Sequence, residues 1–194
     1  MPATDYTASA PPIRASGTRS RAGNAMARTR LAVLEGAARS LASHGVRGTT
    51  MTDIAATGGV AKGTLYNHFR RREDVFAALA EHEIRALGEL VRESADDDLG
   101  AALVLAAQRI STHPAVQRIA ASEPELIGVM LVPSTGVRRV AEDEIAATLR
   151  ASGRDSSPPY VDVVMRWLAS YLARPGDFPA AGAAVLVAGL PDAS

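Results

Sequence analysis

Polar side chains of the kind that bind nucleic acid are concentrated in one short segment, residues 61–69. On a helical wheel Leu65 and Phe69 point together toward a core, which leaves Gly63 and Asn67 facing outward. An amide can form two hydrogen bonds with an adenine edge, while hydroxyls and ammonium groups bind phosphates. The residues on or beside the outward face, which we take as candidate DNA contacts, are Lys62, Gly63, Thr64, Tyr66, Asn67 and His68.

Each of these side chains also has a purely structural interpretation. Asn67 and Lys62 are compatible with ordinary solvated positions, and the Tyr66 ring with packing on a preceding helix. His68 stands next to a core phenylalanine, where a histidine is often a structural group. We favour DNA contact for Tyr66, whose hydroxyl can donate to a phosphate, and for Lys62, which can reach a phosphate or a guanine. For Asn67 and His68 both interpretations stay open.

No comparable set of residues points to catalysis or to a metal. The sequence contains no nucleophile elbow, no phosphate-binding glycine loop and no paired metal signature. It has no cysteine, which excludes disulfides and thiolate ligands and fits a reducing cytoplasm. The pairs His113/Glu123 and Glu81/His82 have surface-like settings that favour solvated side chains. We therefore expect no enzymatic activity, no metal and no cofactor.

The net charge of zero hides a strong asymmetry along the chain. Up to Arg72 there are 11 basic residues against three acidic ones, which gives +8, and the remainder carries 10 against 18, which gives −8. Positive charge confined to one end is typical of a module that binds phosphates, whereas an acidic body is repelled by the same duplex. Chance segregation of charge is the alternative explanation.

The elements that would hold the polar face are indicated on its N-terminal side. Thr50-Met51-Thr52-Asp53 is a capping pattern at the start of a short helix over residues 51–57. Gly58-Gly59-Val60 contains residues that can take positive φ, and it would turn the chain into a helix that begins at Ala61. Because a helix cap also presents backbone N–H groups to a phosphate, Thr50 joins the candidate DNA contacts.

Longer helices are expected on both sides of this pair. Apolar residues recur at helical spacing over residues 27–44, with Gly45 placed for a left-handed cap, and again over residues 72–93. Residues 1–25 lack an apolar period and are expected to form a flexible basic tail. Three arginines of this tail could follow a minor groove or stay solvated, namely Arg14, Arg19 and Arg21.

The remaining sequence favours an all-α fold. The chain is 47% hydrophobic but only 4% aromatic, so its core is built from aliphatic residues that suit packed helices. No apolar run is long enough to span a bilayer or to act as a signal peptide, so we expect an unexported, cytoplasmic protein without membrane contact. The further helices that we expect lie near residues 99–112, 114–121, 123–132, 136–152, 159–173 and 179–190.

The segment 48–55 followed by 59–69 resembles the DNA-binding signature of the TetR family of bacterial regulators. The resemblance covers roughly residues 28–80. It implies a three-helix helix-turn-helix headpiece over residues 26–72, whose third helix enters the major groove, and a ligand-binding and dimerising helical body over residues 73–194. It also adds Arg72, which matches a usual phosphate-binding lysine, to the candidate DNA contacts.

Three positions depart from the usual family pattern. Ala61 stands where a Ser or Thr cap is common, and Gly58 doubles the turn glycine; both could loosen the recognition helix. Arg70-Arg71 replaces a common proline and small polar residue and adds positive charge. None of these departures removes a DNA-facing group.

The resemblance also implies how the body works. It suggests a homodimer formed through the last two helices, binding to a palindromic double-stranded operator, and repression that is relieved by a small molecule of unknown identity. The alternative is a helical DNA-binding or protein-interaction protein without such an effector. The effector pocket is expected near five residues that are equally compatible with an ordinary core: Leu103, Ile110, Leu126, Met130 and Trp167.

Overall fold

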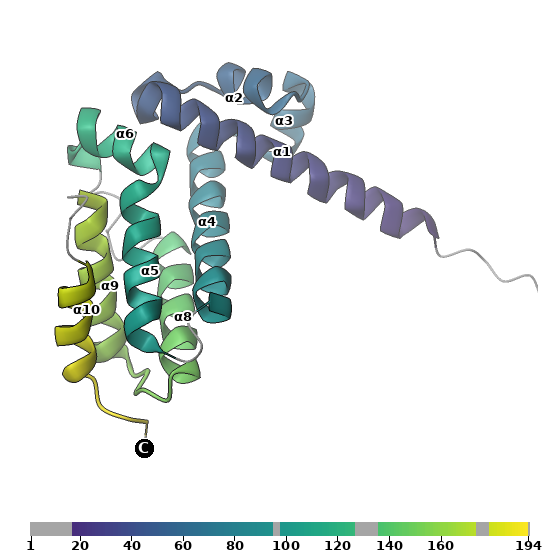
Figure 1. The fold of residues 1–194 in the computed structure, drawn as a ribbon. Coiled ribbons are helices and arrows are strands. Elements are labelled where there is room, and N and C mark those ends of the chain that lie inside the picture. The colour runs from purple at the N-terminus through teal and green to yellow at the C-terminus, as the bar shows by residue number, and fades with distance from the viewer. Residues whose placement is uncertain (1–16, 95–97, 127–135, 174–178, 194) are drawn as a thin grey trace, which may run out of the picture.

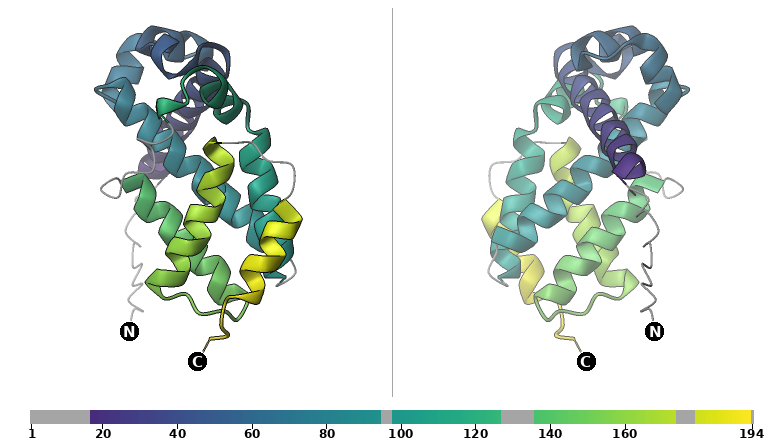
Figure 2. Two further views of the ribbon diagram at one scale, coloured as in Figure 1. Left: turned by 90° about the vertical axis from the view of Figure 1, so that its left-hand side faces the viewer. Right: turned by 90° about the vertical axis from the view of Figure 1, so that its right-hand side faces the viewer.

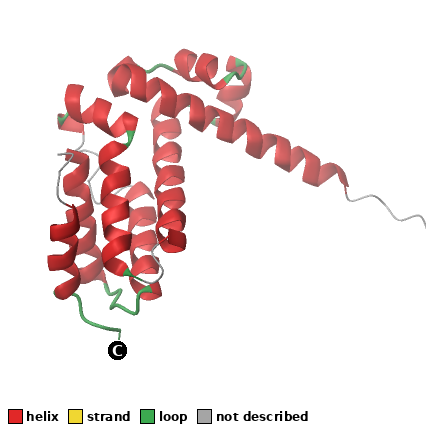
Figure 3. Ribbon diagram, in the orientation of Figure 1, coloured by secondary structure: helices red, strands yellow, loops and turns green. Residues whose placement is uncertain are grey.

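The computed structural model describes residues 17–94, 98–126, 136–173 and 179–193, and within them the chain is built from helices (Figure 1, Figure 3). The one β-type contact among these residues is an isolated bridge between Arg154 and Asp192. The all-α fold expected from the composition is confirmed. The helices are α1 (Gly17–Gly48), α2 (Met51–Gly58), α3 (Lys62–His68), α4 (Arg72–Ser94), α5 (Leu99–Thr112), α6 (Pro114–Ser122), α8 (Gly136–Ala151), α9 (Pro158–Ala173) and α10 (Pro179–Ala188).

The helices form a small headpiece and a larger body. Figures 1 and 2 show α1, α2 and α3 at one end of the molecule and α4 descending from them into a bundle with α5, α8, α9 and α10. Helix α6 follows α5 directly and packs against α1, so it lies between the headpiece and the bundle.

Each part has its own apolar core. In the headpiece Leu65 of α3 and Phe69, the C-cap residue of α3, pack with Leu34 of α1, Ile54 of α2 and Val75 of α4. Burial of such side chains contributes about 1.5–3 kcal/mol each relative to exposure. The body core gathers residues of α5, α8, α9 and α10 and one residue after α10, Leu190; the helix residues are Leu99, Leu103, Ile145, Leu149, Val161, Val164 and Ala183. In the headpiece, α3 is therefore held in place because one face of this helix is buried in the core.

Helix α1 differs from the expectation at its start. It begins at Gly17, so residues 17–25 are helical where the sequence predicted a flexible tail. The prediction failed because this stretch, which includes Arg19 and Arg21, has no apolar stripe to mark it as helix. Arg14 lies outside the described residues. At the other end Gly45 adopts the expected positive φ of 72°, and a short helical turn follows it to Gly48.

The later helices lie close to their expected positions. The helix expected over 99–112 has these bounds, and those expected to start at 114 and 179 start there. The helix expected over residues 123–132 falls largely outside the described residues, which include only its first part, up to Leu126. No helix of the described segments is both long and apolar enough to cross a membrane.

Candidate nucleic-acid interface

Helix α2 begins with the reciprocal cap that the sequence predicted. The Asp53 N–H donates to Thr50 Oγ1 at 3.2 Å, and the Thr50 N–H donates to Asp53 Oδ2 at 2.9 Å. The Thr50 hydroxyl also donates to Asp53 Oδ2 at 2.6 Å. These hydrogen bonds lower the pKa of Asp53, the side-chain bond from Thr50 having the largest effect. Thr50 is exposed, so it can still approach a phosphate while it caps α2.

The turn between α2 and α3 is made by Gly59. This residue takes the left-handed conformation, with φ 66° and ψ 28°, which a glycine adopts without steric cost. Its N–H donates to Ala56 O at 3.2 Å, and the next N–H, from Val60, donates to Ala55 O at 3.0 Å. This pair of bonds closes α2 as a Schellman motif and reverses the chain into α3.

Gly58 has a different role from the one that the sequence suggested. It lies in the last turn of α2 rather than in the left-handed turn, and it packs against Gly36 of α1. A Cβ on Gly58 would lie 2.7 Å from Ala32 O, and one on Gly36 would lie 2.6 Å from Ile54 O. Gly58 therefore permits close approach of α1 and α2.

Helix α3 is anchored along one side. Leu65 is fully buried and Phe69 is 5% exposed. The guanidinium carbon of Arg30, on α1, lies 4.6 Å from the centre of the Phe69 ring, a cation–π contact that covers this ring. Ala61, at the N-cap of α3, makes no side-chain cap hydrogen bond.

The opposite side of α3 faces solvent. Lys62, Gly63, Tyr66 and Asn67 are exposed, and nothing lies within 4 Å of a Cβ built on Gly63. Tyr66 is 53% exposed, so it is not buried in the headpiece core. The two remaining residues of the predicted set, Thr64 and His68, are half-buried at the margins, with the His68 ring 6.4 Å from the Phe69 ring. The six predicted residues of α3 thus lie on its exposed side or at the margins of that side.

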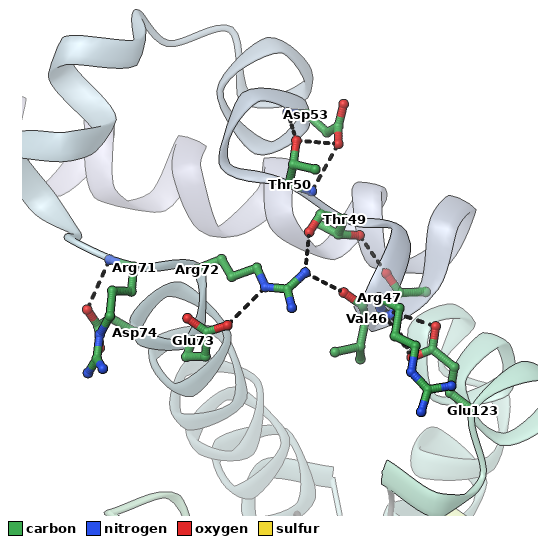
Figure 4. Close-up of polar contacts among 11 residues, drawn as sticks. Val46, Arg47, Thr49, Thr50, Asp53, Arg71, Arg72, Glu73, Asp74 and Glu123 are labelled. Carbon is green, nitrogen blue, oxygen red and sulfur yellow. Dashed lines mark hydrogen bonds and ion pairs between the residues drawn. The ribbon is translucent and has the colours of Figure 1, made fainter.

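Arg72 lies elsewhere, because its side chain points into the protein. Its Nη1 donates to the carbonyls of Val46, at 3.2 Å, and Thr49, at 3.1 Å, and its Nε donates to Glu73 at 2.9 Å (Figure 4). This geometry gives Arg72 a structural role between α4 and the end of α1. A phosphate contact, expected by resemblance, stays a prediction that would have to compete with these bonds.

The neighbouring Arg70 and Arg71 are exposed, so the charge added by this departure from the family pattern is on the surface. The Arg71 N–H donates to Asp74 Oδ2 at 3.1 Å, and its guanidinium pairs with the same carboxylate at 3.3 Å. Sequence reasoning noted the extra charge but did not place these residues among the DNA contacts.

Four of the five predicted pocket residues lie in the described part of the chain. Leu103 and Trp167 belong to the same core, and Trp167 packs edge-on to Tyr171 with 5.1 Å between ring centres. Ile110, further along α5 than Leu103, and Leu126, after α6, are half-buried, and Met130 lies outside the described residues. Among the described residues no group of acidic or histidine side chains is arranged to hold a metal ion. The pocket stays a prediction.

Comparisons with known proteins find matches to the part of the chain that carries this surface. The family model of bacterial regulatory proteins of the tetR family matches residues 33–79, which span the headpiece core, α2 and α3. The transcriptional repressor AcnR of Corynebacterium diphtheriae is 29% identical over 161 residues, covering 75% of this chain and 81% of that protein. The transcriptional repressor LfrR of Mycolicibacterium smegmatis is 30% identical over 120 residues, covering 62% and 57% of the two chains.

Solved structures match over a larger part of the chain. The TetR family repressor AlkX from a Dietzia strain superposes with a TM-score of 0.64 at 20% identity, covering 82% of this chain and 91% of that one. The multidrug binding protein EbrR gives a TM-score of 0.62 at 20% identity, covering 85% and 96%. At this level of identity the likeness establishes the shared fold of headpiece and body.

Proposed function

Because the chain belongs to the tetR family of bacterial regulatory proteins, we propose that it represses transcription as a homodimer on a palindromic operator. It is a DNA-binding transcriptional regulator of the helix-turn-helix type. The observation that supports the proposal most directly is the exposed surface of α3, held outward by buried Leu65 and Phe69. Repression is the activity printed in the names of AcnR and LfrR.

The proposal gives four residues of this surface a role. Asn67 reads a base edge in the major groove, Tyr66 and Lys62 bind phosphates, and Gly63 lets the helix backbone come close to the duplex. The positive charge that ends at Arg72 supplies the attraction for DNA. The proposed target is DNA, so the cytoplasm is the proposed location of the protein.

The dimer is proposed to form through α9 and α10. Helix α10 carries no charged residue, and its Val185 is 77% exposed, while Val163 on α9 is 46% exposed. A twofold axis through this face would present two copies of α3 to successive major grooves of a palindrome. Residues 26–72 would act as the DNA-binding unit and the remaining body as the dimerising unit.

The body is also proposed to bind a small molecule that releases the DNA. This part rests on the family's helical body, with Leu103, Ile110, Leu126, Met130 and Trp167 as the proposed lining. A thermal-shift screen of small molecules tests it, because a ligand at one hundred times its Kd stabilises the protein by about 2.7 kcal/mol. If no compound shifts the unfolding of the body, the alternative without an effector gains support.

Selection of bound DNA from random sequence tests the regulator proposal. We expect a palindromic site, and affinity that falls steeply with salt because several phosphates are neutralised. Replacing Asn67 by Ala should reduce discrimination at one base position by about 1–3 kcal/mol. Gln108→Ala, which removes an exposed amide from α5, is the matched control and should change nothing. Recovery of no preferred sequence would overturn the proposal.

A further inference from the structure

Glu123 is a buried carboxylate that joins the body to the headpiece. It follows the last residue of α6 and is only 6% exposed. Its Oε2 accepts from the Val46 N–H at 3.1 Å, and its two oxygens accept from the Arg47 N–H at 3.2 and 3.3 Å. A buried carboxylate is costly unless it is hydrogen-bonded in this way.

The geometry of α1 explains why these amides are available. At Gly45 the backbone leaves the helical conformation, with φ 72° and ψ −176°, so the helical turn after it begins with N–H groups that lack helical acceptors. Glu123 caps this turn as a side chain from a distant part of the chain. Gly45 also makes room for it, because a Cβ at this position would lie 2.5 Å from Glu123 Oε1.

The same turn is held from its other side by α4. The Arg72 guanidinium, on α4, donates to the carbonyls of Val46 and Thr49 (Figure 4). The N–H groups of Val46 and Arg47 donate to the Glu123 carboxylate at the end of α6. The turn is therefore clamped between the two helices that connect headpiece and body.

This clamp has a mechanical consequence. The headpiece continues into the body through α4, and a single helical connection leaves rotation about its own axis weakly restrained. A second attachment away from that axis opposes the rotation. The Glu123 contact is such an attachment, because α6 continues from α5 of the body and reaches the end of α1.

We propose that Glu123 is a positioning residue that fixes the orientation of the headpiece on the body and thereby the spacing of DNA half-sites that the dimer accepts. The inference rests on the proposed dimeric DNA binding. In a dimer the distance between the two α3 helices depends on how each headpiece sits on its body. A looser attachment lets the dimer accept other spacings and weakens its binding to the preferred one, since orientation must then be restricted on binding.

A nearby acidic residue provides the matched control. Glu125 pairs with the Arg47 side chain at 2.7 Å, but both side chains are more than half exposed, and exposed ion pairs contribute little. Glu125→Gln makes the same change of charge as Glu123→Gln, two residues away, and leaves the amides of Val46 and Arg47 capped. Glu123→Gln instead places an NH2 group among N–H donors.

The experiment measures affinity for palindromic duplexes whose half-sites are separated by the selected spacing or by one or two base pairs more or fewer. We expect Glu123→Gln to lower the ratio of affinities between the preferred and the altered spacings about tenfold, which corresponds to about 1.4 kcal/mol. Glu123→Asp, which keeps the charge but shortens the side chain, should act in the same direction. Glu125→Gln should match the unmodified protein. Hydrogen exchange at the Val46 and Arg47 amides should accelerate only in the two Glu123 variants.

The outcomes separate this inference from the proposed function. If the unmodified protein shows no preferred spacing, the dimeric operator proposal fails first. If it has one and folded Glu123 variants keep it unchanged, the positioning role is wrong. If Glu123→Gln does not fold, Glu123→Asp is measured in its place. A loss of affinity that is equal at every spacing also contradicts the role, because it indicates a purely structural effect.

Discussion

At the scale of single residues, the contact between Thr50 and Asp53 makes the start of α2 sensitive to pH. Hydrogen bonds from the Thr50 hydroxyl and then from its N–H lower the pKa of Asp53 below the ordinary value of 3.8. A carboxylate whose pKa is lowered by folding stabilises the folded state at pH values above the pKa of the unfolded chain. This contribution is lost as the pH falls below 3.8 and through the lowered value.

We therefore expect Asp53→Asn to lower the midpoint of thermal unfolding near neutral pH, and the difference from the unmodified protein to shrink below pH 3.8. Circular dichroism melts at a series of pH values measure it. In a Thr50→Val background the substitution should have a smaller effect, because the hydroxyl donor has gone. A difference that is the same at all pH values would show that the charge of Asp53 does not stabilise the cap.

The same residues show which site features a sequence can reveal. Thr50 and Asp53 are three positions apart, and the side chains of α3 follow from one helical period, so a local pattern was enough to predict both. Arg72 and Glu123 contact residues 23 to 77 positions away. Only the packed fold brings these groups together, and the sequence therefore suggested a phosphate contact for Arg72 and a solvated side chain for Glu123.

At the scale of elements, two glycines of the headpiece have opposite surroundings, one closely packed and one open. Gly36 on α1 meets α2 so closely that a Cβ would lie 2.6 Å from Ile54 O and from Gly58 N. Gly63 on α3 has nothing within 4 Å of a built Cβ, so its openness has no explanation in the packing of the described residues. The first glycine serves the fold, and the second is proposed to leave room for DNA.

Exchanging each glycine for alanine should separate these roles. Gly36→Ala should lower the free energy of unfolding by about 1–3 kcal/mol, because backbone atoms of α2 cannot move away cheaply. Gly63→Ala should leave stability unchanged or raise it by up to about 1 kcal/mol while DNA binding weakens. Urea unfolding and titration of a short duplex measure the two effects. Gly63→Ala with full DNA affinity would show that the α3 backbone does not approach the duplex closely.

Helix boundaries were predicted correctly where an apolar stripe or a capping residue marked them in the sequence. Helix α5 carries apolar residues at helical spacing and a capping Asp98, and its bounds were predicted correctly. The first turns of α1 have neither signal, and their helical form was missed. Helix α6 was predicted as part of the body, but its Ala115 packs in the headpiece core, a relation that depends on tertiary structure alone.

At the scale of the whole molecule, the proposed dimer requires α10 to form part of the interface between the two copies. This helix is apolar throughout, and it buries Ala183 against the body while Val185 faces outward with 77% exposure. Covering an apolar side chain that is so exposed with a second copy of the chain lowers the free energy, because apolar surface is removed from water. In the proposed complex each headpiece contacts one half-site, so a monomer would lose the second set of phosphate and base contacts.

We expect Val185→Asp to convert the dimer into a monomer, because a carboxylate at a twofold interface is buried opposite its own copy. Light scattering after size exclusion measures the mass, and titration measures the affinity for the palindrome, which should fall toward that of a single half-site. Ala86→Asp, which adds the same charge at an exposed position of α4, should leave both unchanged. A Val185→Asp protein that stays dimeric and binds the palindrome as before would place the interface on another face of the body.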